Sequence, residues 1–106
     1  MFWERTLDRK LVKYQNMETI KTLVINNDLG LHARAAAKIV ALVGQYQSEF
    51  FLKKGEKEVD GSSILAILTL SCPKGTEVEA KTVGDDSEAL MEAMCTLFEQ
   101  KFGESK

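Results

Sequence analysis

The sequence has little of several features that would point to particular classes of protein. Its 14 basic and 16 acidic residues are interspersed and give a net charge of −2, so they predict no basic surface for nucleic acid. Only two cysteines are present, Cys72 and Cys95, at a spacing that matches no metal site. We therefore expect no metal, no cofactor and no nucleic-acid partner, and two reduced, buried thiols in a reducing compartment.

Long apolar runs are missing as well. No stretch approaches the roughly 20 residues that span a bilayer, so we expect no stable membrane insertion. The first residues also lack the continuous apolar region of a signal peptide. These absences predict a cytoplasmic protein, which we also expect to be a monomer.

What is present fits one globular domain. The chain has 106 residues, of which 44% are hydrophobic, enough for a single core. Strand patterns cover residues 19–26, 48–52, 57–59 and 76–82, with a hairpin between the second and third, and helix patterns cover residues 33–44 and 64–70. A last helix follows the cap Asp85-Asp86-Ser87, and a polar tail begins at Gly103. The order βαββαβα predicts an α+β fold, with three helices on one face of a four-stranded sheet.

The only histidine lies where a turn leads into a helix. In the run Asn27-Asp28-Leu29-Gly30-Leu31-His32-Ala33-Arg34, Gly30 allows a tight turn and His32 falls in the first helical turn. A neutral imidazole is a nucleophile, and phosphate on it would be held by Arg34 and by free amides such as that of Ala33. A lone histidine at a helix start is also commonly a capping residue without chemistry. The residues alone leave both interpretations open.

Two motifs resemble a known family. The run Gly30-Leu31-His32-Ala33-Arg34, followed by alanines, resembles the histidine signature of HPr, the phosphocarrier of the bacterial phosphoenolpyruvate-dependent phosphotransferase system. The run from Ser62 to Leu70 resembles the serine site and short second helix of the same family, and Lys74-Gly75 and Glu77 also fit. The resemblance covers roughly residues 17–102.

The resemblance implies an open-faced β-sandwich with a four-stranded antiparallel sheet. It also implies a function in phosphoryl transfer. Nδ1 of His32 would accept a phosphoryl group from phospho-enzyme I, with Arg34 beside the phosphate, and pass it to a IIA-type domain. Such a protein is a carrier with a phosphohistidine intermediate rather than a self-sufficient enzyme, and it serves sugar uptake or nitrogen-related regulation. The alternative is a regulatory protein-binding module on the same fold, controlled at Ser63.

One position departs from the family pattern. Ala35 follows the arginine, where the family usually has proline. Alanine loses the preset backbone angle of proline but keeps a helix former and one more amide donor. The sequence around His32 is more similar to the NPr variants of the nitrogen-related branch.

Ser63 has two interpretations. Either Ser62 or Ser63 caps the following helix. The resemblance also aligns Ser63 with a serine that an HPr kinase/phosphorylase modifies in some bacteria, which implies that enzyme as a further partner. A phosphate there would add about two negative charges to the partner-binding face.

The resemblance places the docking surface for partner proteins next to His32. Its expected residues are Ala37, Ala41 and Gly44 on the first helix, and Ile64, Leu65 and Leu68 on the short helix. Ile64 and Leu68 have a second interpretation as core residues, and Ile67 and Leu70 are expected in the core. An exposed Leu65 would favour docking.

Residues 1–16 differ from the predicted domain over residues 17–106. Trp3, Leu7, Leu11 and Tyr14 are spaced for one face of a short amphipathic helix. HPr-like chains usually begin near the position of Met17, so a misassigned start is one interpretation of these residues. The other is such a helix, which would pack on the domain, bind a partner or lie on a membrane surface.

Overall fold

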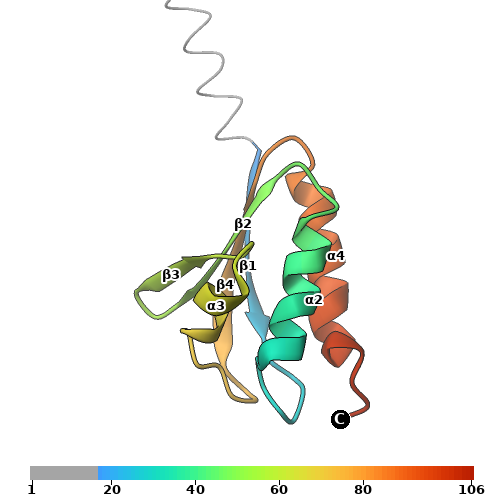
Figure 1. The fold of residues 1–106 in the computed structure, drawn as a ribbon. Helices are drawn as coiled ribbons and strands as arrows, with labels where there is room; N and C mark the ends of the chain where they lie inside the picture. Colours follow the sequence, from blue (N-terminus) through green and yellow to red (C-terminus); the bar gives the residue numbers. More distant parts are fainter. Residues whose placement is uncertain (1–16) are drawn as a thin grey trace, which may run out of the picture.

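The computed structural model describes residues 17–106 (Figure 1). Its elements are β1 (Glu18–Val24), α2 (Ala33–Val43), β2 (Glu49–Lys54), β3 (Lys57–Asp60), α3 (Ile64–Leu68), β4 (Glu77–Val83), α4 (Ser87–Glu99) and a 3-10 helix, η1 (Lys101–Gly103). The predicted order βαββαβα is confirmed, with bounds that differ by one or two residues. The predictions for residues 1–16 lie outside the described residues.

The four strands form one antiparallel sheet in the order β1-β4-β2-β3. Figure 1 shows α2 and α4 side by side against one face of the sheet, with α3 on the other side of α2 from α4. The other face is open, as in a two-layer sandwich with one layer of strands. This arrangement confirms the predicted fold class.

The alternation along β4 explains why only one face is covered. Val78 and Ala80 point inward and are buried, whereas Glu77, Glu79 and Lys81 point outward. On the open face Lys81 lies 3.4 Å from a carboxylate oxygen of Glu58. A strand with this pattern is stable only where one side meets a core and the other meets water.

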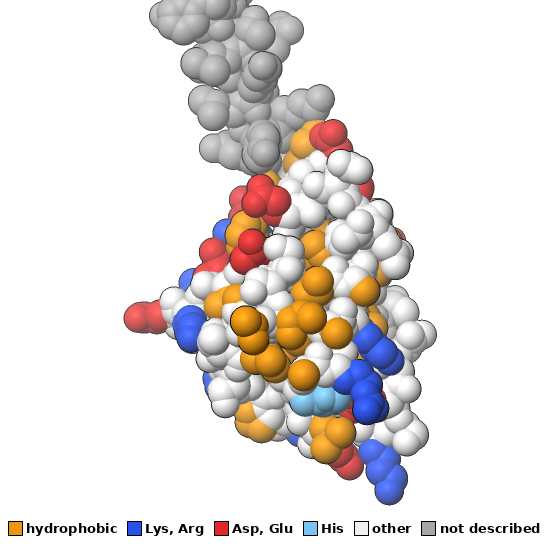
Figure 2. Space-filling view, viewed as in Figure 1, with side chains coloured by type: hydrophobic (Ala, Val, Ile, Leu, Met, Phe, Trp, Pro, Cys, Tyr) orange, Lys and Arg blue, Asp and Glu red, His pale blue; other side chains and the backbone are white. Residues whose placement is uncertain are grey.

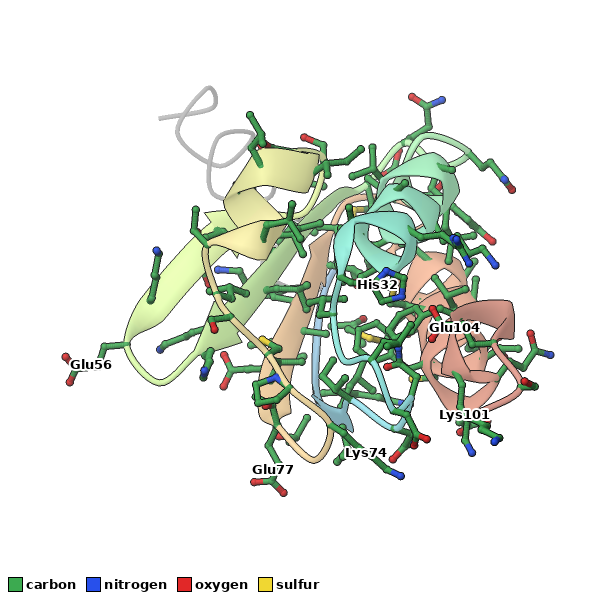
Figure 3. All side chains as sticks on the ribbon, turned by 60° about the horizontal axis from the view of Figure 1, so that its bottom comes forward. His32, Glu56, Lys74, Glu77, Lys101 and Glu104 are labelled. Carbon is green, nitrogen blue, oxygen red and sulfur yellow. The ribbon has the colours of Figure 1, made fainter. Side chains whose placement is uncertain are left out.

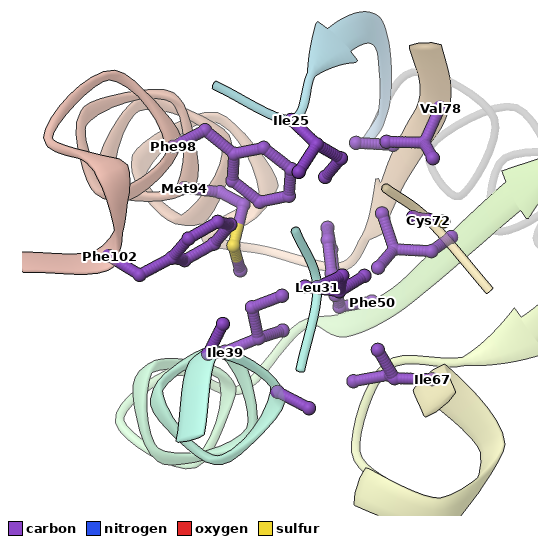
Figure 4. Close-up of a cluster of buried hydrophobic side chains, with 14 of the residues drawn as sticks. Ile25, Leu31, Ile39, Phe50, Ile67, Cys72, Val78, Met94, Phe98 and Phe102 are labelled. Atoms are coloured by element: carbon purple, nitrogen blue, oxygen red, sulfur yellow. The ribbon is translucent and has the colours of Figure 1, made fainter. Parts of the chain in front are cut away.

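The core lies between the sheet and the helices (Figure 4). Ile39 from α2, Phe50 from β2 and Ile67 from α3 are almost fully buried there. The last helix contributes Met94 and Phe98, and the buried Phe102 of η1 extends the core to the end of the chain. The chain therefore continues to pack against the core after the end of α4, where the sequence predicted only a tail.

Asp86 does not cap its own helix through its side chain, which corrects the sequence prediction. It occupies the N-cap position of α4, but its carboxylate accepts hydrogen bonds from the amides of Gln47 and Ser48, each at 2.9 Å, and from the Ser48 hydroxyl. The Ser48 hydroxyl and then the Gln47 amide lower the pKa of Asp86. The carboxylate ties the loop after β4 to the turn after α2.

Candidate functional site

His32 occupies the N-cap position of α2, one residue before the helix begins. Its carbonyl oxygen accepts from the amide of Ala36 at 2.9 Å, and its ring Nδ1 accepts from the amide of Arg34 at 3.3 Å. The first amides of a helix have no acceptor within the helix, and they attract negative charge. Nδ1 therefore lies against the positive end of α2.

Gly30 is required by the loop that positions His32. Its φ is +72°, and a Cβ at this position would lie 2.6 Å from the carbonyl oxygen of Cys72 and 2.9 Å from Cα of Pro73. The amide of Leu31 donates to the same Cys72 oxygen at 2.8 Å, and the amide of His32 donates to Gly30 at 3.0 Å. The loop before α2 is thus seated directly on the loop before β4, and only glycine fits there.

A carboxylate from the end of the chain completes the site. Oε2 of Glu104 lies 2.5 Å from Nε2 of His32, and Figure 3 shows the two side chains pointing toward one another. Nδ1 is already an acceptor, so Nε2 carries the hydrogen and donates it to Glu104. The side chains are 27% and 13% exposed, so both are largely shielded while the ring stays accessible.

The docked end of the chain brings Glu104 to His32. Phe102 is buried and packs edge-on against Phe98, with ring centroids 4.9 Å apart. Lys38 of α2 donates to the carbonyl oxygen of Phe102 at 2.5 Å. Residues 103–106 are polar, as predicted, but the docking of this segment and the contact of Glu104 with His32 were missed. Phe102, four residues after Phe98, was the available signal that apolar packing continues.

Asn27 holds the second oxygen of the same carboxylate. Its side-chain nitrogen, in a fully buried side chain, donates to Oε1 of Glu104 at 2.8 Å and to the carbonyl oxygen of Gly30 at 2.7 Å. The hydrogen bond from Asn27, then that from His32, lowers the pKa of Glu104, and the charge of Arg34 acts in the same direction. Glu104 is therefore ionised at neutral pH.

The predicted phosphate-binding residues lie in the first turn of α2. Ala33 and Arg34 are both exposed. The guanidinium of Arg34 forms no ion pair with any residue from 17 to 106. Figure 2 shows basic side chains beside the histidine on the accessible surface. A bound anion at Nδ1 would thus meet an unpaired guanidinium.

An apolar surface borders the histidine (Figure 2). Leu65 is 78% exposed, and Ile64 is also exposed, so neither is a core residue. The other residues expected in this surface are the exposed Ala37, Ala41 and Gly44 and the half-buried Leu68. Leu29, which is 71% exposed, was not predicted. Ile67 and Leu70 are buried in the core, as predicted.

Ser63, not Ser62, is the residue that caps α3. Its hydroxyl oxygen accepts from the amide of Ala66 at 3.2 Å. Ser62 instead donates from its amide and its hydroxyl to Asp60, at 2.8 and 2.7 Å, and these bonds lower the pKa of Asp60. The capping interpretation holds for Ser63, whose side chain is half-buried.

Other kinds of site have little support within residues 17–106. In this range no three histidine, cysteine or acidic side chains are grouped as metal ligands. The helices described are too short or too polar to cross a bilayer. Cys72 is buried, and burial raises the pKa of its thiol, but Cys95 is only half-buried, contrary to prediction.

Comparison with known proteins identifies the family. Residues 19–100 match the family model described as the PTS HPr component phosphorylation site. Phosphocarrier protein HPr of Xylella fastidiosa strain 9a5c is 38% identical over 82 residues, which are 77% of this chain and 92% of that protein. Phosphocarrier protein NPr of Shewanella violacea is 35% identical over 85 residues, 80% of this chain and 93% of that protein. A crystal structure of HPr from Thermoanaerobacter tengcongensis superposes with a TM-score of 0.79 at 36% identity and covers 83% of this chain and 99% of that one. The chain belongs to the HPr family of phosphotransferase-system phosphocarrier proteins.

Proposed function

We propose that His32 accepts a phosphoryl group on Nδ1 from phospho-enzyme I and passes it to a IIA-type domain. The position of Nδ1 supports this assignment best, because it lies at the N-terminus of α2 while Nε2 is occupied by Glu104. Only Nδ1 therefore has a lone pair free to attack phosphorus. The proposal places this chemistry in the cytoplasm, with a phosphohistidine as the intermediate.

The surroundings of Nδ1 suit a dianionic phosphate. On phosphorylation the long contact between Nδ1 and the Arg34 amide would be replaced by hydrogen bonds from first-turn amides, including that of Ala33, to phosphate oxygens. The exposed guanidinium of Arg34 would add charge-assisted hydrogen bonds. Both transfers need a partner protein, because the described residues around His32 include no group that would activate a small phosphoryl donor.

The experiment that tests the function is phosphorylation with phosphoenolpyruvate and a catalytic amount of enzyme I, followed by phosphorus NMR. We expect one acid-labile phosphoramidate signal. In protein labelled with ¹⁵N at histidine, this signal should couple to Nδ1. Absence of labelling with cognate enzyme I would contradict the carrier function, and coupling to Nε2 would contradict the proposed atom.

We assign the apolar surface as the docking site for both partners. It borders His32, and its residues from α2 and α3 are exposed without a covering element from residues 17–106. A partner must bring phosphorus to bonding distance of Nδ1, so it has to bury the surface beside the ring. Leu65, the most exposed large side chain of this surface, is its natural anchor.

Leu65→Asp should weaken transfer by removing this anchor. Burying a leucine contributes about 1.5 to 3 kcal/mol, so we expect a roughly 10- to 100-fold loss of kcat/KM with enzyme I. Ile20→Asp is the matched control, because Ile20 is half-exposed on β1. Equal kinetics of the two variants in a rapid-quench phosphorylation assay would rule out the proposed surface.

Ser63→Asp tests the proposed regulation by phosphorylation. Asp is as good an N-cap as Ser, so α3 should stay folded while a negative charge is added beside Leu65. We expect slower transfer from enzyme I. The control is Ser63→Asn, which keeps a cap without the charge. If both variants transfer phosphate at the wild-type rate, Ser63 acts as a cap alone.

The run around His32, from Leu29 to Ala35, is more similar to the NPr variants, which supports the nitrogen-related branch over sugar uptake. We infer that a nitrogen-type IIA domain is the preferred acceptor. A competition assay tests this assignment: a nitrogen-type and a sugar-type IIA domain are mixed with the phosphorylated protein, and the phosphate taken up by each domain is measured.

A further inference from the structure

We propose that Glu104 is a positioning residue for phosphoryl transfer, which holds His32 in the tautomer with an unprotonated Nδ1 and balances the charge of the phosphorylated ring. The proposal rests on the function proposed above. It assigns a function to residues 101–106, the docked C-terminal segment. This segment lies outside the sequence motifs around His32.

The two contacts of the ring select the same tautomer. The amide of Arg34 is a donor, so Nδ1 facing it at 3.3 Å must be an acceptor. The carboxylate of Glu104 is an acceptor, so Nε2 at 2.5 Å must be a donor. A carboxylate on one ring nitrogen is a general means of fixing which nitrogen is free to react. Here it leaves the nucleophilic lone pair on Nδ1.

The carboxylate is itself held in place. Asn27 donates to Oε1 while His32 donates to Oε2, so both oxygens are engaged. The backbone on either side of Glu104 is tied down as well, because Lys38 binds the carbonyl of Phe102 and the amide of Asp28 donates to the carbonyl of Lys106 at 3.0 Å. Asn27 and Lys38 thus connect Glu104 to the two segments that flank His32.

The charges around Glu104 keep it ionised. His32 and Arg34 face it from the start of α2, and the buried Asn27 donates to it from the loop before that helix. The nearby Asp28 is paired with Lys74 at 2.8 Å, and that contact and the charge of Lys101 lower the pKa of Asp28. Glu104 thus meets two nitrogen donors directly and one guanidinium at longer range.

With this arrangement the transfer needs no proton to leave the ring. The lone pair of Nδ1 forms the new bond to phosphorus, and the bond from phosphorus to the donor breaks, with its electron pair leaving on the donor. Nε2 keeps its hydrogen, and the ring acquires a positive charge that Glu104 balances from 2.5 Å. When phosphate moves to the acceptor, the electron pair returns to Nδ1 and the neutral ring is restored.

The lowered pKa of Glu104 sets the direction of the pH dependence. The carboxylate contacts are complete at neutral pH and are lost as the pH falls through this lowered pKa, below the ordinary range of a glutamate. An ionised Glu104 is therefore available to orient the neutral His32 ring at neutral pH.

Nitrogen NMR of the unphosphorylated protein provides a first test, independent of enzyme I. In the wild type we expect the His32 ring in the Nε2–H form. Glu104→Gln has one oxygen for two donors, Asn27 and His32, so the Nδ1–H form should become populated. Glu104→Ala should also release the preference, and Glu99→Gln, an exposed position on α4, is the control for loss of one charge.

Phosphorylation rates provide the second test. Partners that orient metal-bound histidines typically contribute about 10- to 100-fold to function, and by analogy we expect a loss of this size in Glu104→Gln, with Glu99→Gln unchanged. Unchanged tautomers and rates in both Glu104 variants would overturn the proposal. If enzyme I fails to label the wild-type protein, the proposed function is wrong, and the tautomer measurement still decides what Glu104 does.

Discussion

His32→Ala is expected to abolish phosphorylation by enzyme I and to change stability only modestly. The imidazole is the only nucleophile proposed for the site, and alanine offers no replacement. The structural loss is one long capping contact with Arg34 and the donor to Glu104. Loss of an N-cap costs about 0.5 to 2 kcal/mol, so the variant should remain folded. Phosphorus NMR gives the chemical result, and urea unfolding gives the stability.

His32→Asn separates the chemistry from the capping. Asparagine is among the best N-cap residues, and its amide can accept from Arg34 as Nδ1 does in the wild type. We expect stability close to that of the wild type and no phosphohistidine. Labelling that persists in either variant would show that another residue carries the phosphate.

Gly30→Ala is expected to lower the stability of the protein more than His32→Ala does. The added Cβ would meet backbone atoms of Cys72 and Pro73 at 2.6 and 2.9 Å, and backbone cannot rotate away as a side chain can. A positive φ costs a residue with a Cβ about 1 to 2 kcal/mol, and overpacking adds about 1 to 3 kcal/mol. Transfer should also slow, because the carbonyl of Gly30 accepts from both His32 and Asn27.

Gly55→Ala and Gly75→Ala are matched controls for this effect. Both glycines have positive φ values, +60° and +91°, but a Cβ at either position would have nothing within 4 Å. They should show the cost of the backbone angle without the clash. If all three variants unfold at the same urea concentration, the contact between the two loops does not constrain the site.

The sequence was sufficient for the parts of the molecule that depend on local patterns. Alternation predicted the inward and outward faces of β4, and the glycine before the helix predicted the tight turn at Gly30. His32, Arg34 and Leu65 could be singled out as candidate site residues because each belongs to a short motif. The physical reason is that strand faces, helix starts and turns are decided by neighbours within a few residues.

The sequence was insufficient where one side chain meets a distant segment. Asp86 fits an N-cap by its neighbours, but its carboxylate binds Gln47 and Ser48 instead. Glu104 stands in a polar stretch, and it reaches His32 only because Lys101 and Phe102 adopt positive φ values that turn the chain back. Residues other than glycine rarely take this conformation, so no local rule predicts it.

The separation of His32 from Glu104 has a consequence for a chain still on the ribosome. The two residues are 72 positions apart, and the pairing of β1 with β4 is complete only when Val83 has been made. Synthesis proceeds from the N-terminus at about 5 to 20 residues per second. A nascent chain thus displays its histidine before the carboxylate exists. During that interval the ring would lack the partner that, on the proposal above, selects its tautomer.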